Sequence, residues 1–142
     1  MNSEIFCTPH LGAVSLTFDD GRTSQLQKAI PAMDNFGIRG TFYLNPRGGR
    51  WQEYIGRWAE VARTGHEIGN HSLSHFCSGN LTGRSSGLED RLLAEVEADI
   101  LTAQEWLEGI APHQKQWTFA YPCYQTFVGR GAERQSYVPV VA

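Results

Sequence analysis

The sequence predicts an α/β domain built from parallel βαβ units. Short strand-like runs alternate with helical patterns along the chain. Polar residue groups follow three of these strands, and the chemistry of parallel α/β folds gathers at the carboxyl ends of strands. With 142 residues, 41% hydrophobic and 11% aromatic, the chain can form one domain with a core.

The first half of the chain predicts two strand–helix units. We expect a strand over 13–18, a helix over 24–36, a strand over 38–45 and a helix over 51–64. Pro31 should kink the first helix or mark a later start, because it cannot donate a backbone hydrogen bond. Gly37 and Gly65 are placed to end the two helices.

The second half predicts a further unit and a strand. We expect a strand over 66–70, a loop over 76–87, a helix over 88–107 and a strand over 117–121. The tail, 124–142, has no clear period, and its last apolar run, 138–142, suits the start of another strand.

Charge and composition exclude several kinds of partner. The net charge is −3 without a lysine or arginine block, so neither nucleic acid nor an acidic membrane is expected to bind. No apolar run approaches the ~20 residues that span a bilayer, and the first residues lack a signal-peptide pattern, which favours a cytoplasmic protein. Cys7, Cys77 and Cys123 are odd in number and widely spaced. They predict neither a disulfide framework nor a Cys-x-x-Cys zinc site.

Two adjacent carboxylates, Asp19 and Asp20, follow the first predicted strand and precede Gly21. Neighbouring anions repel each other unless a cation lies beside them. The alternative is an ordinary Asp-Asp-Gly turn.

His71 and His75 follow the third predicted strand and lie four residues apart. On one helical turn both imidazoles would face the same way, which suits two ligands of one metal ion. Two histidines and one carboxylate leave coordination positions open, as in catalytic sites for zinc or a similar divalent metal. One aspartate would then bind the metal and the other would take a proton from water. The alternative is a pair of ordinary polar histidines.

Four segments carry a family resemblance: 17–21 (TFDDG), 40–43 (GTFY), 65–75 (GHEIGNHSLSH) and 119–123 (FAYPC). In this order and spacing they resemble the motifs of the polysaccharide deacetylases, the NodB-homology group or carbohydrate esterase family 4. The resemblance covers about residues 13–125. It implies a deformed, incomplete (β/α) barrel, here a single domain over 1–142 that is truncated after the fourth βα unit. It also implies hydrolysis of N- or O-acetyl groups on sugars such as chitin oligomers, peptidoglycan or xylan.

The resemblance also assigns roles to individual residues. Asp19 would be the general base, Tyr121 would belong to the catalytic set, and the backbone N–H of Cys123 would stabilise the oxyanion. Ser72 would brace the histidine loop. The metal ligands would be Asp20, His71 and His75, holding zinc, or alternatively cobalt or nickel.

The sequence departs from the family pattern in three places. Ala120 stands where many members have an arginine, Cys123 stands where an aromatic residue is common, and no histidine follows residue 125 to act as the general acid. Of the other histidines, His66 is expected to be a strand residue near the site. A second hypothesis is therefore a truncated domain that binds metal and sugar with little turnover, in an oligomer that covers its exposed strand edge. A third is a small-molecule amidohydrolase on the same scaffold.

Several residues keep two interpretations. The four tryptophans, Trp51, Trp58, Trp106 and Trp117, either stack on sugar rings or fill the core, and the core is favoured. Cys123 as a nucleophile and Cys77 as a soft ligand are disfavoured against quiet roles. Three arginines, Arg47, Arg50 and Arg130, either meet an anionic substrate or are solvated, and solvation is favoured.

Overall fold

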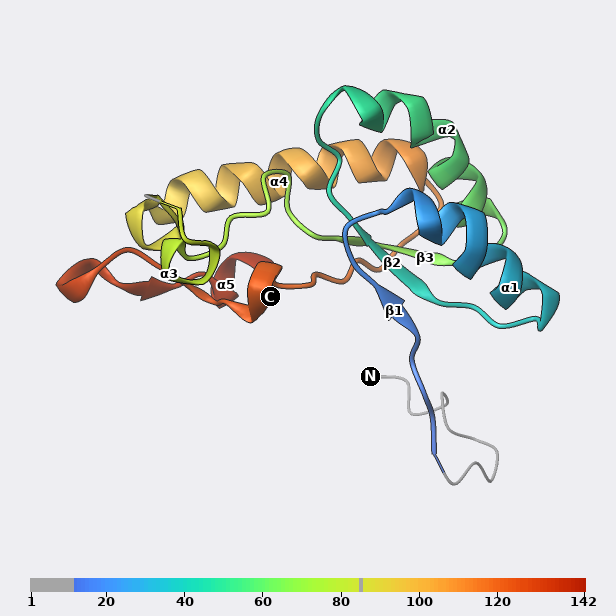
Figure 1. Ribbon diagram of the computed structural model, residues 1–142, viewed down its shortest axis with the longest axis horizontal. Coiled ribbons are helices and arrows are strands. Elements are labelled where there is room, and N and C mark those ends of the chain that lie inside the picture. The colour runs from blue at the N-terminus through green and yellow to red at the C-terminus, as the bar shows by residue number, and fades with distance from the viewer. Residues whose placement is uncertain (1–11, 85) are drawn as a thin grey trace.

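The computed structural model describes residues 12–84 and 86–142, and it confirms the predicted α/β class (Figure 1). Three parallel strands form a sheet in the order β1 (Thr17–Phe18), β2 (Thr41–Leu44), β3 (Glu67–Asn70). Phe42 of β2 lies between Phe18 and Ile68 in the register. All three strands therefore end at the same edge of the sheet, next to the polar groups that follow them.

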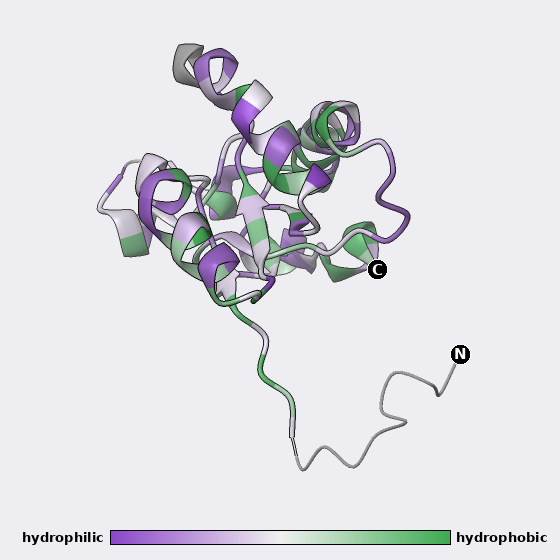
Figure 2. Ribbon diagram, turned by 90° about the vertical axis from the view of Figure 1, so that its right-hand side faces the viewer, coloured by the Kyte–Doolittle hydropathy of each residue, from purple (hydrophilic) through white to green (hydrophobic). Residues whose placement is uncertain are grey.

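The first strand is shorter than predicted. Pairing with β2 covers Thr17 and Phe18 only, and residues 12–16 are exposed. Figure 2 shows this apolar segment leading away from the body of the molecule, and Val14 is 88% exposed. Residues 13–18 alternate in sequence as a strand would, but within the described part of the chain no strand pairs with them before Thr17.

The helix predicted over 24–36 forms, but its first part is irregular. A π-helical turn over Gln25–Ala29 leads into α1 (Ile30–Asn35), and the Ile30 N–H donates to the Gln25 carbonyl. Pro31 stands in the first turn of α1, where a missing N–H costs little. Residues 23–35 stay helical, so the later start is not seen, and the irregular π-helical turn directly before Pro31 agrees with a local distortion of the helix.

The helix α2 (Gly49–Arg63) follows β2 and fills the core from one face of the sheet. Trp58 is 1% exposed and Trp51 is 6% exposed, so both are core residues, as favoured from the sequence. His66, in contrast, lies at the start of β3, away from the carboxyl ends of the strands. Its ring contacts Asp34, and it accepts the Gly40 N–H.

The strand predicted over 117–121 does not form in full. Residues 117–121 make a single parallel bridge, Asn70 to Phe119, with hydrogen bonds from Asn70 N to Thr118 O and from Ala120 N to Asn70 O. The predicted loop 76–87 contains a short helix, α3 (Gly79–Thr82). The helix predicted over 88–107 begins as a 3-10 turn (Leu88–Asp90) and continues as α4 (Leu93–Ile110).

The helix α4 connects two apolar clusters (Figure 1). Its last turns, with Leu107 and Ile110, pack into the core beneath the sheet, whereas Val96 and Ile100 pack with Val128 of the C-terminal segment. None of the helices in the described ranges is long and apolar enough to cross a membrane.

The tail forms small elements that cover the first half of α4. They are the 3-10 turn Pro122–Tyr124, β4 (Phe127–Val128), the 3-10 turn Gly131–Glu133, β5 (Gln135–Ser136) and α5 (Val138–Val141), with β4 and β5 antiparallel. The strand predicted from the apolar run 138–142 is wrong, because these residues turn into α5 with Pro139 in its first turn. Arg130, expected to be solvated, pairs with Asp90 at 2.8 Å while remaining largely exposed.

Candidate metal centre

The two carboxylates of the first motif are separated by a sharp turn at the end of β1. Asp20 has φ +73° and Gly21 has φ +58°, so the chain reverses directly after the strand. The turn is fixed by Gln25, whose side-chain amide donates to the Asp19 carbonyl at 2.6 Å. Asp19 lies exposed beside Asp20, which is half-buried.

The histidine segment is a braced loop and not the helical turn that the spacing suggested. Ser72 and His75 adopt left-handed backbone conformations, with φ of +60° and +52°. The Ser72 hydroxyl accepts the His75 N–H at 3.0 Å, as the resemblance implied, and the Asn70 side chain accepts the Ser72 N–H at 2.8 Å. These bonds, and not helical periodicity, bring the two imidazoles to one side.

Long-range contacts hold the same loop from outside. The Asp99 carboxylate of α4 accepts the N–H of Leu73 at 2.9 Å and that of Ser74 at 3.1 Å. The Asn45 amide, after β2, donates to the carbonyls of His71 and Ser72. Sequence spacing could not indicate these supports, because they come from elements about 25 residues away in either direction.

Asp20, His71 and His75 converge. The Oδ1 atom of Asp20 lies 3.4 Å from Nε2 of His75 and 3.8 Å from Nε2 of His71, and the two rings meet edge to face. Ligand atoms placed tetrahedrally at ~2.05 Å from zinc lie about 3.3 Å apart. The three residues therefore fit a divalent ion with only small adjustments.

The environment of each ligand is also suited to a metal. The Ala120 carbonyl lies 2.7 Å from Nδ1 of buried His71 and can accept a hydrogen bond from its N–H, which leaves the lone pair on Nε2 facing Asp20. The second oxygen of Asp20 accepts two hydrogen bonds from Arg22, so Oδ1 is the oxygen that faces the histidines. Burial, and the nearby His71, lower the pKa of His75, which favours the neutral ligand form.

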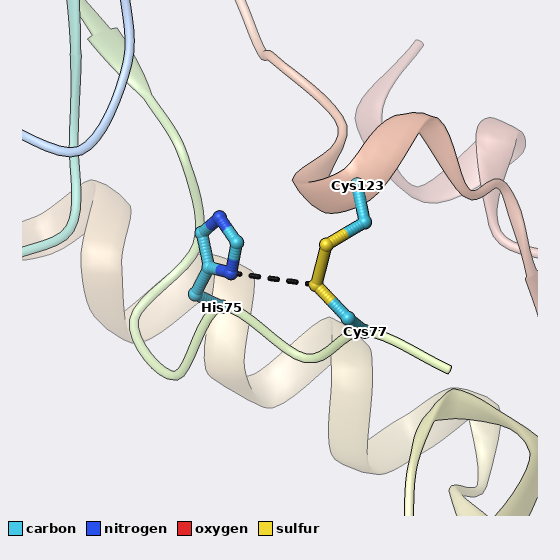
Figure 3. A group of neighbouring side chains, drawn as sticks. All are labelled: His75, Cys77 and Cys123. Carbon is cyan, nitrogen blue, oxygen red and sulfur yellow. Dashed lines mark hydrogen bonds between the residues drawn. A yellow bond between two sulfur atoms is a disulfide. The ribbon is translucent and has the colours of Figure 1, made fainter. Parts of the chain in front are cut away.

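The segment 119–123 reaches the centre through a disulfide, and the prediction that the cysteines form none is wrong. Cys77 and Cys123 are bonded, with Cα atoms 5.8 Å apart, and Sγ of Cys77 lies 3.5 Å from Nδ1 of His75 (Figure 3). The two cysteines are 46 residues apart, and no periodic pattern in the sequence indicated that they would pair. Cys77 nevertheless follows the histidine segment by two residues, and Cys123 ends the segment 119–123. These positions in the sequence indicated that the two cysteines could lie close together.

Tyr121 lies in a group of packed aromatic side chains. Its ring meets Phe119 edge to face at 5.1 Å and lies 5.4 Å from the ring of Tyr137, and burial raises its pKa. The catalytic role of Tyr121 stays a prediction.

Unusual backbone is concentrated in or next to the segments 17–21, 65–75 and 119–123. In the described part of the chain, the non-glycine residues with positive φ are Asp20, Ser72, His75, Cys123 and Tyr124. A left-handed conformation costs a non-glycine residue about 1–2 kcal/mol. Such residues cluster where surrounding contacts hold a functional arrangement.

A cleft of about 650 Å³ opens beside the ligands. Its walls include Asp20, Arg47 and Trp51. The Trp51 side chain is buried, and its Nε1 has no hydrogen-bond partner within the described ranges. A buried donor on a cleft wall is suited to a polar ligand.

The fold and the three converging side chains define an α/β protein with a candidate metal centre at the carboxyl ends of its parallel strands. The family model for polysaccharide deacetylase matches residues 8–126, so the chain belongs to the polysaccharide deacetylase family. This confirms the resemblance drawn from the motifs.

The chain matches part of the length of several known proteins. It is 29% identical over 96 residues to a chitin deacetylase of Arthroderma benhamiae, covering 67% of this chain and 26% of that protein. Its fold is similar to a family 4 acetyl xylan esterase of Clostridium thermocellum solved with a cobalt ion (TM-score 0.58, 23% identity, covering 78% of this chain and 49% of that one). It is also similar to a CE4 family pseudoenzyme of Bacillus anthracis (TM-score 0.61, 19% identity, covering 89% and 38%).

Proposed function

We propose that this protein is a metal-dependent deacetylase that hydrolyses acetyl groups on a carbohydrate. The observation that supports it most is the convergence of Asp20 Oδ1 with the Nε2 atoms of His71 and His75. The name of the chitin deacetylase relative supports a sugar substrate, and the cobalt-bound esterase supports a divalent ion. Because the chain spans about a quarter of that relative, its activity and substrate remain a proposal.

The residues divide the reaction between them. Asp20, His71 and His75 would hold the ion, with zinc first and cobalt or nickel as alternatives. When bound, a divalent ion supplies a Lewis acid and a more acidic water. Asp19, exposed and next to Asp20 in the chain, would take the proton of the attacking water, and the Cys123 N–H would donate to the developing oxyanion.

Paired substitutions test this division. Asp20→Asn should lower metal affinity, whereas Asp19→Asn should retain the metal and abolish acetate release from acetylated chitin oligomers. Asp34→Asn is the matched control, because Asp34 pairs with Arg39 and His66 near the start of β2 and β3. Equal metal loss in the Asp19 and Asp20 variants would show that the division is wrong.

A second candidate is a metal-binding domain with little turnover. Ala120, in place of the arginine of many members, contributes its carbonyl to His71, and one similar fold is a pseudoenzyme. Bound metal without acetate release from any acetylated sugar would favour this candidate. Turnover of cyclic ureides or formamides alone would favour the small-molecule amidohydrolase instead.

A further inference from the structure

His75 lies between two groups of potential metal ligands. Its Nε2 faces Asp20 at 3.4 Å, and its Nδ1 faces Sγ of Cys77 at 3.5 Å (Figure 3). The ligand atoms of His75, Cys77 and Cys123 all lie within 4.8 Å of one another, as do those of Asp20, His71 and His75. In the disulfide the two sulfurs bind each other, and reduction makes them available as thiolates.

We propose that reduced Cys77 and Cys123 form, with Nδ1 of His75, a second metal site that takes thiophilic divalent ions such as Zn²⁺ or Cd²⁺. Two thiolates and one imidazole are a known ligand set for zinc, with an open fourth position. Sulfurs bound to one zinc at ~2.3 Å lie about 3.8 Å apart. Cα atoms 5.8 Å apart allow this separation through rotation of the two side chains.

Contacts other than the disulfide keep the two cysteine segments together. The Ser78 N–H, next to Cys77, donates to the Gln125 side chain at 2.6 Å. The Cys77 carbonyl accepts the Leu88 N–H at 3.1 Å, and the buried Tyr137 hydroxyl donates to the Gln125 carbonyl. The reduced thiols therefore stay near His75.

The two sites compete for one side chain. A neutral imidazole has one nitrogen with a free lone pair, so a metal on Nδ1 leaves the proton on Nε2, which faces Asp20. The disulfide thus decides which site uses His75. This competition rests on the metal centre proposed above, whereas the thiolate site itself does not.

The chemistry of the switch balances with an external reductant. A phosphine breaks the S–S bond, each sulfur takes a proton from water, and the phosphorus is oxidised to a phosphine oxide with the oxygen of that water. A dithiol does the same by exchange and ends as its own disulfide. Metal binding then releases the two thiol protons.

The test is a Cd²⁺ titration, followed by the ultraviolet thiolate-to-cadmium charge-transfer band and by the bound-metal stoichiometry. All proteins carry Cys7→Ser, because Cys7 lies outside the described residues. Phosphine-reduced protein, freed of reductant without air, should show the band. Oxidised protein and the reduced Cys77→Ser/Cys123→Ser variant should not.

Two further variants locate the third ligand. In an Asp20→Asn background the band should persist, and adding His75→Gln should weaken Cd²⁺ binding about tenfold or more, because losing a ligand costs at least as much as losing an outer-shell partner. No band in the reduced protein, or no effect of His75→Gln, would overturn the thiolate site. Two ions bound at once would overturn the competition for His75. Oxidised protein that binds no metal would refute the catalytic centre alone, since the thiolate band would still report the second site.

Discussion

Removing the disulfide should lower the free energy of unfolding substantially. The bond closes a loop over a sequence separation of 46 residues. In the chain-entropy description such a loop lowers the entropy of the unfolded chain by about 13 cal/mol/K, which is about 4 kcal/mol at 25 °C. A chain of 142 residues gains roughly 0.3 kcal/mol/K on unfolding, so the midpoint temperature should fall by roughly 13 °C.

Urea unfolding measures this effect in two independent ways. Oxidised protein is compared with phosphine-reduced protein, and with the Cys77→Ser/Cys123→Ser variant, which leaves two serines of similar size. Cys7→Ser is the matched control and should change the free energy of unfolding little. A difference below about 0.5 kcal/mol would refute the reasoning, because surface substitutions alone reach that size.

Three other perturbations test how the centre is held and used. Asp99→Asn weakens the bonds to the N–H groups of Leu73 and Ser74, so metal affinity should fall about tenfold by calorimetry while the oxidised fold persists. Trp51→Phe removes the Nε1 donor, which has no partner within the described residues. The KM for an acetylated oligosaccharide should rise about fivefold, the equivalent of about 1 kcal/mol, while metal binding is unchanged. An unchanged KM would show that Nε1 contacts no substrate. The lowered pKa of His75 means that the folded state binds this proton less readily than the unfolded state. The stability contributed is complete above pH 6.5 and is lost as the pH falls through the lowered pKa, so the urea midpoint of metal-free protein should drop more between pH 7 and pH 5 than that of His75→Gln.

The sequence was informative where structure depends on local pattern. The strands β2 and β3 and the helix α2 follow from alternation and helical spacing, and their apolar positions, such as Phe42, Trp58 and Ile68, are buried as expected. Apolar spacing cannot say how far a strand is paired. The pattern therefore did not reveal that residues 13–16 are exposed, or that residues 117–121 contribute only one bridge.

The candidate ligands were also predictable, but their geometry was not. Asp20, His71 and His75 stand in motifs that lie at strand ends, so the topology alone brings them together. The orientation of the rings depends on contacts that no spacing encodes, such as the Ala120 carbonyl on His71 and the Asp99 carboxylate behind the loop. The helical turn inferred from the four-residue spacing was wrong because the segment is a loop in which Ser72 and His75 adopt left-handed backbone conformations.

The same contacts explain why the loop can hold ligands in an unfavourable backbone. Ser72 and His75 each cost about 1–2 kcal/mol in the left-handed region. The hydrogen bonds that Asn70 and Asp99 accept from the loop each contribute on the order of 1 kcal/mol, more where the carboxylate accepts, and together they offset that cost. Asn70 is itself held by the Ile100 carbonyl of α4, so the loop is stable only while α4 is packed on the sheet. Metal affinity and packing of α4 should therefore be lost together, and binding measured along a urea transition should follow the unfolding of the helix.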